Sequence, residues 1–264
     1  MNSDKLAAQV AGSIRDSQAT VRNAAASPRT KARITGVVYL LFFLTAALGA
    51  LVAPGISGLG GVASDAAATA NTILAHETSY RLGWALSLIS TACYVALMAL
   101  FYQLFRSVNR SVALLAAFFG LVGCAVTALQ SLFQLAPLAI LGGSPYLSVF
   151  NGKQLQALAL LSLNLNVQAG SIALVFFGVF QLMIGYLIFR STFLPRFLAV
   201  LVALAGLGWL IFLSPSLANS LLTYLEVLGV LGELPLMLWL LVMGVNAQRW
   251  KEQASAAEAS SAHL

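Results

Sequence analysis

Residues 111–141 read SVALLAAFFGLVGCAVTALQSLFQLAPLAIL and contain no Asp, Glu, Lys or Arg. About 20 apolar residues in a helix cross the roughly 30 Å of hydrocarbon in a bilayer, so this run predicts a membrane-spanning helix. A membrane β-barrel would show alternating polarity and evenly spaced turns, which the sequence lacks. The composition agrees, because 60% of the residues are hydrophobic and only 8% are charged, whereas globular domains carry about 25% charged residues.

Five more long apolar runs flank this one, at residues 34–53, 82–105, 158–189, 193–213 and 222–245. We therefore predict an all-α, polytopic membrane protein with six transmembrane helices in a domain of residues 33–247. The runs at 111–141 and 158–189 are longer than a bilayer requires, so they must tilt or project from it. The first run follows basic residues as a signal peptide does, but signal peptides have only about 7 to 15 apolar residues, which favours a retained span.

Polar segments surround the spans. Residues 1–32 are rich in Ala, Ser and scattered basic residues, which predicts a disordered basic tail, and residues 248–264 form a second tail. Between the first two spans, a glycine-rich turn at 54–61 precedes residues 64–77. There a Ser or Asp cap before an Ala-rich stretch predicts a short interfacial helix.

The basic residues indicate the orientation of the chain. Twelve of the 14 Lys and Arg residues lie before the first span or after the second, fourth and sixth, and only Arg81 and Lys153 lie in the opposite loops. Cytoplasmic loops carry the excess of Lys and Arg, so both termini are predicted in the cytoplasm. The net charge of +6 therefore does not indicate nucleic-acid binding, since the cations are not gathered on one face of a soluble domain.

Aromatic residues near the span ends are interpreted as interfacial anchors, which hold helix ends at the level of the lipid headgroups. This interpretation covers Tyr39, Tyr102, Tyr186 and Trp250 near the cytoplasmic ends, and Tyr80, Trp84, Tyr146 and Tyr224 near the outer ends.

Two of the predicted cytoplasmic turns have similar sequences. Residues 102–107 read YQLFRS and residues 186–191 read YLIFRS. One hypothesis is a hairpin of spans 2 and 3 that is repeated as spans 4 and 5, about an axis along the membrane normal. The alternative is convergence, because Tyr, Arg and a capping Ser suit any turn at the inner leaflet.

Several stretches resemble a known family. They are RITGVVYL at 33–40, VNRS at 108–111, GYLIFRS at 185–191 followed by Leu194-Pro195, and GEL at 232–234 with LWLLV at 238–242. Over roughly residues 30–250 the chain is similar to the bacterial integral-membrane family named domain of unknown function 4386. The resemblance implies a multi-span protein of the bacterial cytoplasmic (inner) membrane. It brings no activity and no catalytic residues.

The last span carries two acidic residues, Glu226 and Glu233. Seven residues are two helical turns, so both lie on one face about 10 Å apart along the axis. Glu233 is expected near mid-membrane, two residues before Pro235, where the missing backbone donor predicts a kink or a loosened turn. No Lys or Arg is expected at that depth. Because polar groups inside a bilayer are costly, Glu233 is expected to be protonated or hydrogen-bonded to amides.

Four amide side chains in neighbouring spans are candidate partners for this acid. Gln130 and Gln134 lie one turn apart, as do Asn164 and Gln168, so each pair shares a helix face in the outer half of the bilayer. One interpretation is a ligand-binding polar cavity open to the outside, lined by these amides and Glu226 and closed below by Glu233. The other is that the amides bond to each other and hold the bundle together.

No metal or cofactor is predicted. His76 and His263 lie outside the spans, and neither has a second ligand at metal spacing. Cys93 and Cys124 lie inside apolar runs, where a free thiol behaves as a small hydrophobic group.

The favoured hypothesis is binding or transport of a small-molecule or lipid ligand, with Glu233 as a proton-carrying or ligand-binding group. One alternative is a membrane-embedded enzyme, which needs a nucleophile, a metal cluster or an acid/base pair, and for which the two glutamates are the only support. The other alternative is a membrane interaction or assembly protein. The sequence predicts no oligomeric state.

Overall fold

A computed structural model describes residues 27–53 and 65–261, and every regular element in these residues is a helix. Six helices are long and apolar enough to cross a membrane, which confirms the all-α, six-span prediction. They are α2 (Pro28–Val52), α4 (Glu77–Phe105), α5 (Arg110–Leu141), α6 (Gly152–Arg190), α7 (Arg196–Leu210) with the 3₁₀ turn η2 (Ile211–Leu213), and α8 (Pro215–Val242). The shorter elements are α3 (Ala66–Ala75), η1 (Pro145–Leu147) and α9 (Ala247–Ser261).

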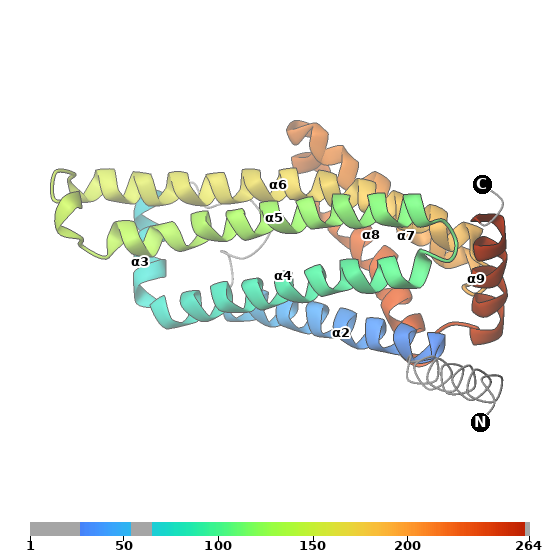
Figure 1. Cartoon of the computed structure of the whole chain (residues 1–264). Coiled ribbons are helices and arrows are strands. Elements are labelled where there is room, and N and C mark those ends of the chain that lie inside the picture. Colours follow the sequence, from blue (N-terminus) through green and yellow to red (C-terminus); the bar gives the residue numbers. More distant parts are fainter. Residues whose placement is uncertain (1–26, 54–64, 262–264) are drawn as a thin grey trace, which may run out of the picture.

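The two predicted overlong spans are overlong in the structure. Helix α5 has 32 residues and α6 has 39, which correspond to roughly 48 Å and 58 Å at 1.5 Å per residue. Figure 1 shows their hairpin extending beyond the other helices at the end of the bundle opposite α9.

Helix α2 starts earlier than predicted. Ser27 caps it by accepting a hydrogen bond from the Thr30 backbone N–H at 3.2 Å, and Pro28 occupies the first turn, where its missing N–H costs nothing. Residues 28–32, which the sequence places in the basic tail, are therefore helical. The rest of that tail and the glycine-rich turn at 54–61 lie outside the described residues.

The predicted interfacial helix between the first two spans is α3. The Asp65 side chain accepts hydrogen bonds from the backbone N–H groups of Ala67 and Ala68, which are two of the unpaired donors at the start of this helix. Helix α3 crosses from the start of α4 to α5 and α6, where its buried Ile73 joins an apolar cluster with Tyr80, Leu138 and Leu163.

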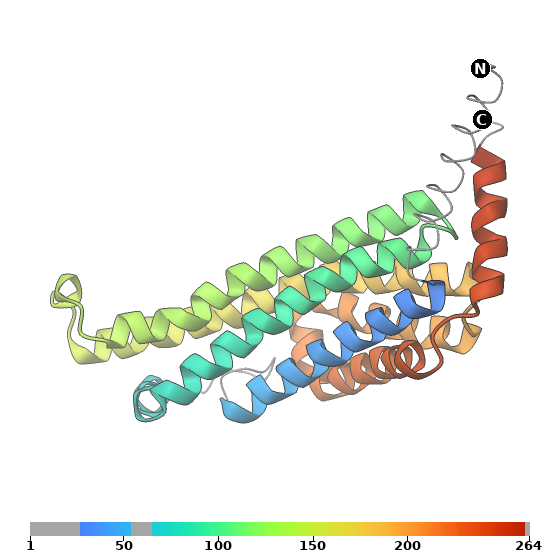
Figure 2. The same cartoon turned by 60° about the horizontal axis from the view of Figure 1, so that its bottom comes forward.

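The six spans form a closed ring. Each contacts the next along the chain, and α8 returns to contact α2. The start of α2 and helix α9 lie at the same end of the bundle (Figures 1 and 2). We call this the α9 end and the opposite one the α3 end.

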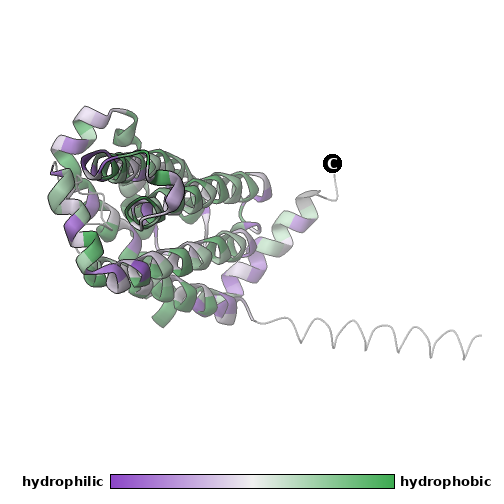
Figure 3. Ribbon diagram, turned by 90° about the vertical axis from the view of Figure 1, so that its left-hand side faces the viewer, coloured by the Kyte–Doolittle hydropathy of each residue, from purple (hydrophilic) through white to green (hydrophobic). Residues whose placement is uncertain are grey.

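The ring is filled at its α9 end and apolar on its outside. Phe101, Phe105, Leu187 and Leu240 belong to a large buried cluster there. Apolar residues also cover the outer faces of the spans, as the end-on view in Figure 3 shows. An apolar exterior of this extent suits a lipid environment.

Helix α9 packs across the turns at its end. The Trp250 Nε1 donates to the Leu104 carbonyl at 2.9 Å. Gln253 Oε1 accepts from the Thr192 backbone N–H at 3.1 Å, and its Nε2 donates to the Arg190 carbonyl at 3.3 Å. Much of the predicted C-terminal tail is thus a docked helix that bridges the α4–α5 and α6–α7 turns.

The two turns with similar sequences share a local hydrogen bond. Ser107 Oγ donates to the Leu104 carbonyl at 3.3 Å, and Ser191 Oγ donates to the Ile188 carbonyl at 2.7 Å. The aromatic residues differ, since Phe105 is buried and Phe189 is exposed. The hairpin repeat stays a prediction.

Candidate functional site

Glu233 on α8 points into the bundle and is held by two neutral donors. The Tyr39 hydroxyl, on α2, donates to Glu233 Oε2 at 2.6 Å. The Gln181 amide, on α6, donates to Glu233 Oε1. Three spans that are far apart in sequence therefore meet at one partly buried acid. The amide that bonds to it is not one of the four predicted partners.

The close approach of α7 and α8 orients Glu233 towards the interior. A Cβ atom on the preceding residue, Gly232, would lie 2.4 Å from the Ala205 Cβ and 2.9 Å from the Leu201 carbonyl oxygen, so only glycine fits between the two helices. Helix α8 continues through Pro235, whose missing N–H leaves the Leu231 carbonyl without its helical donor.

Tyr39 and Tyr80 are not the interfacial anchors that we predicted. Tyr39 is only 3% exposed and Tyr80 only 1%, and the Tyr80 hydroxyl donates to the Gln134 carbonyl. Because α2 begins at Pro28, Tyr39 is eleven residues into its helix and reaches the depth of Glu233. The outer residues Tyr146 and Tyr224 are largely exposed, as expected of anchors.

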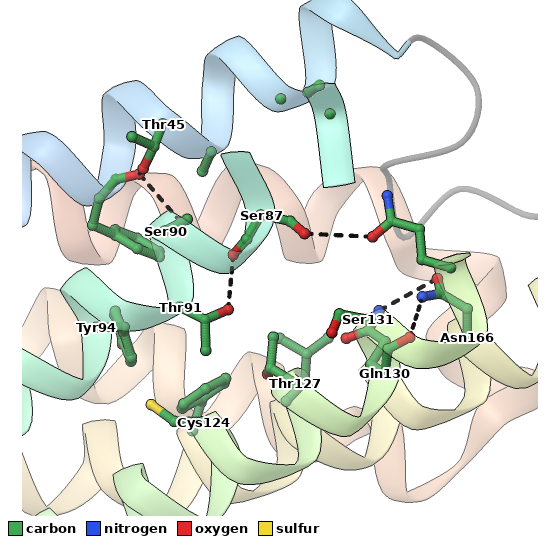
Figure 4. A pocket seen from close by; sticks show the side chains of 18 of the residues that line it. Thr45, Ser87, Ser90, Thr91, Tyr94, Cys124, Thr127, Gln130, Ser131 and Asn166 are labelled. Carbon is green, nitrogen blue, oxygen red and sulfur yellow. Dashed lines mark hydrogen bonds between the residues drawn. The ribbon is translucent and has the colours of Figure 1, made fainter. Parts of the chain in front are cut away.

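A pocket of about 330 Å³ opens inside the ring, in the half towards the α3 end. All six spans contribute to it, and Figure 4 labels lining residues from α2, α4, α5 and α6. Its hydroxyl-bearing residues come from α2, α4 and α5, its amides from α5 and α6, and Glu233 comes from α8. The polar lining residues are Thr45, Ser87, Ser90, Thr91, Tyr94, Thr127, Gln130, Ser131, Gln134, Asn166 and Glu233.

The amides in the pocket also bond across helices. Asn166 Nδ2 on α6 donates to the Gln130 carbonyl on α5 at 2.9 Å, and Gln130 Nε2 lies 3.5 Å from Asn166 Oδ1. Ser87 Oγ on α4 donates to Gln134 Oε1 at 3.4 Å. The two interpretations of the amides are therefore compatible, since the same side chains connect helices and line a cavity (Figure 4).

Three of the six predicted site residues, Gln130, Gln134 and Glu233, line this pocket. The other three do not. Asn164 and Gln168 are exposed, and the Asn164 amide donates to the Leu160 carbonyl of its own helix. Glu226 is partly exposed at a distance from the pocket lining. The two glutamates are therefore not neighbours in one cavity.

The prediction selected the wrong face of α6. Residues 164 and 168 share a face, whereas Asn166 is rotated by about 200° from Asn164. The inward face of α6 carries small residues at helical spacing, and Asn166 and Gln181 belong to it. The buried residues of this stripe include Ala159, Ser162, Asn166, Ala169, Ala173, Gln181 and Ile184. Small residues let spans approach closely, so this stripe was the available signal for both missed amides.

Aromatic rings form the rest of the wall near Glu233. Tyr94 packs between Phe42, with ring centroids 4.7 Å apart, and Phe177, at 5.0 Å. Trp209 also lines the pocket, and its ring lies against Gly229, where a Cβ atom would be 2.1 Å from Cζ2. Within residues 27–53 and 65–261, the lining contains no Lys, Arg or His, and Glu233 is its only acid.

Residues 27–53 and 65–261 contain no group of three His, Cys, Asp or Glu side chains that could hold a metal ion. His76 lies near the Thr72 carbonyl, and His263 is outside the described residues. Cys93 and Cys124 are free thiols, of which Cys124 is buried and lines the pocket.

The family model described as "Domain of unknown function (DUF4386)" matches residues 34–244, so the chain belongs to this family. The match begins in α2 and ends just after α8, and so it includes the helices that line the pocket. No curated protein and no solved structure matches the chain significantly.

Proposed function

We propose that this DUF4386 protein binds a small molecule within the membrane, in the pocket that ends at Glu233, as a binding or transport protein. The observation that carries the proposal is a cavity that has hydroxyl, amide and carboxyl groups in its lining and is enclosed by six apolar spans. Polar and ionisable groups inside a bilayer are costly, and they usually line a ligand or ion pathway. A volume of about 330 Å³ is within the range of small-ligand pockets, roughly 300 to 1,000 Å³.

The distribution of charge supports a pocket that faces out of the cell. Of the eleven Lys and Arg residues that the structure describes, nine lie at the α9 end, and only Arg81 and Lys153 lie at the α3 end. An excess of cations marks the cytoplasmic side. The proposed setting is therefore a bacterial cytoplasmic membrane, with the packed α9 end inside and the hollow α3 half outside.

Glu233 is the proposed ligand-binding or proton-carrying group. It lies at the closed end of the pocket, where the apolar cluster of the α9 end begins. The enzymatic alternative has less support, because Glu226 does not line the pocket with Glu233 and cannot complete an acid/base pair there.

Thiol labelling in intact cells tests whether the pocket is open to water. With Cys93 and Cys124 replaced by Ala, Thr127→Cys places a thiol in the pocket wall. A membrane-impermeant maleimide added outside the cells should label it, because a polar pocket that admits ligand also admits water.

Leu129→Cys is the matched control. Leu129 is two residues further along α5 at nearly the same depth, but its side chain is exposed on the apolar exterior. It should remain unlabelled because thiols in hydrocarbon do not meet the aqueous reagent. The proposal fails if Thr127→Cys is as unreactive as Leu129→Cys, or if it reacts only after the reagent is admitted to the cytoplasm.

A further inference from the structure

We propose that the ligand of this pocket is a small organic cation of the ammonium type, with its charged group between the Glu233 carboxylate and the aromatic wall. This inference rests on the proposed function and adds the chemical class of the ligand. Three features in and beside the pocket carry it: an acid without a countercharge, a group of rings near that acid, and a buried acceptor behind the acid that lacks a donor in bonding geometry.

The first feature is the unbalanced acid. Both described hydrogen bonds to the Glu233 carboxyl come from the neutral donors Tyr39 and Gln181. Among the residues that the structure describes, no basic side chain lines the pocket. A carboxylate removed from water needs a positive partner, and here only a proton or a ligand can supply it. A cationic ligand is therefore complementary to this site, whereas an anionic one would be repelled.

The second feature is the wall of rings. Phe42, Tyr94 and Phe177 line the same pocket as Glu233, with Tyr94 in contact with both phenylalanines. A cation within about 6 Å of a ring centroid is attracted to the ring face, and groups of such rings bind alkylammonium head groups. These rings accept a weakly hydrated cation more readily than a strongly hydrated one.

The third feature is a buried oxygen without a partner. Gln181 is 2% exposed and lies beside Glu233 rather than in the pocket lining, and its Oε1 has no donor within hydrogen-bonding geometry among the residues that the structure describes. Its other amide atom bonds to Glu233. This uncompensated acceptor adds to the negative potential beside the carboxylate, which favours positive charge nearby.

Metal ions fit the same pocket poorly. Ca²⁺ takes six to eight oxygen ligands, and Mg²⁺ binds through carboxylates while keeping several waters. Here a single carboxylate is already bonded to Tyr39 and Gln181, and the adjoining wall is aromatic. The combination of one acid with several rings suits an organic cation.

Three probes of nearly equal shape separate charge from size. They are choline, its uncharged isostere 3,3-dimethylbutan-1-ol, and the anion 3,3-dimethylbutanoate. Binding to the purified full-length protein in lipid nanodiscs would be measured by isothermal titration calorimetry. Fluorescence of Trp209, which lines the pocket, gives a second readout. We expect choline to bind at least tenfold more tightly than the alcohol, and the anion to bind more weakly still.

Two variants test whether the preference for choline over the alcohol arises from Glu233 and the aromatic rings. Glu233→Gln keeps the side-chain shape and should reduce the ratio of choline to alcohol affinity to about one. Phe177→Leu keeps the acid but removes one ring, and it should weaken choline several-fold more than the alcohol. Phe177 is only partly buried, which makes this variant tolerable if Glu233→Gln does not fold.

The outcomes separate this inference from the proposed function. Equal or tighter binding of the alcohol or the anion overturns the cation assignment, and so does a choline preference that persists in both variants. Failure of all three probes to bind also overturns it. In each of these cases, labelling of Thr127→Cys from outside would leave the proposed function standing. An unlabelled Thr127→Cys would instead end the proposed function and this inference together.

Discussion

Glu233 connects three spans through one hydrogen bond to Tyr39 and one to Gln181. Removing either bond by a conservative substitution should lower the free energy of unfolding. Tyr39→Phe removes only the hydroxyl that donates to Glu233 Oε2. It should lower the free energy of unfolding by about 0.5 to 1.5 kcal/mol, the usual net value of one hydrogen bond. Denaturation in mixed micelles measures it. Tyr186→Phe, at an exposed tyrosine, is the control and should change nothing. Equal stability of the two variants would contradict the structural role of the Tyr39 contact.

The Glu233 side chain itself allows a second comparison. Glu233→Gln keeps polar atoms near Tyr39 and Gln181, so stability should change little if the carboxyl serves mainly as a hydrogen-bonding group. Glu233→Leu leaves both donors without an acceptor and should cost about 1 to 3 kcal/mol in the same unfolding experiment. If Glu233 binds a ligand or carries a proton, Glu233→Gln should abolish ligand binding while the protein stays folded. A Glu233→Leu protein as stable as the original would show that these buried contacts contribute little.

Helices α2 and α8 close the ring through backbone contact at Gly36. A Cβ atom there would lie 2.4 Å from the Leu241 backbone nitrogen and 2.6 Å from its Cα. Gly36→Ala should therefore force the helices apart and cost about 1 to 3 kcal/mol, as overpacking does. Gly152→Ala is the matched control, because nothing lies within 4 Å of the added methyl group. It should be neutral or slightly stabilising. Equal thermal stability of the two variants would argue against this close approach.

The bundle as assembled predicts which loops face each side of the membrane. Lys153 lies at the α3 end and Ser216 lies at the α7–α8 turn, on the side of α7 away from the α9 end, and cysteines at both positions should react with an impermeant maleimide from outside intact cells. Cysteines at Asn109 and Thr192 lie at the α9 end, with both original residues exposed, and should react only after permeabilisation. The physical basis is the concentration of described Lys and Arg residues at the α9 end. Labelling of Thr192→Cys from outside would reverse the proposed orientation.

The sequence by itself determined the all-α membrane class of this protein, the number of its spans and the two overlong helices. These depend on the length and charge of apolar runs, which are read along one dimension. Local capping chemistry at Asp65 likewise predicted α3. Ser27 and Pro28 are likewise a local signal for the start of α2. A span that starts at Ile34, where the apolar run begins, puts Tyr39 at the membrane surface, whereas the start at Pro28 puts it inside the bundle.

Only the tertiary structure decided which face of each span turns inward. In a soluble helix the buried face is the apolar one, but in a bilayer the lipid-facing side is apolar too, so polarity does not distinguish the faces. Polarity alone therefore left Asn164 and Asn166 equally plausible, the small residues of α6 favoured the face of Asn166, and the packing of α6 on α5 placed Asn166 in the pocket. Tyr39 and Gln181 became partners of Glu233 for the same reason: helix packing brings together residues from three spans that no sequence pattern connects.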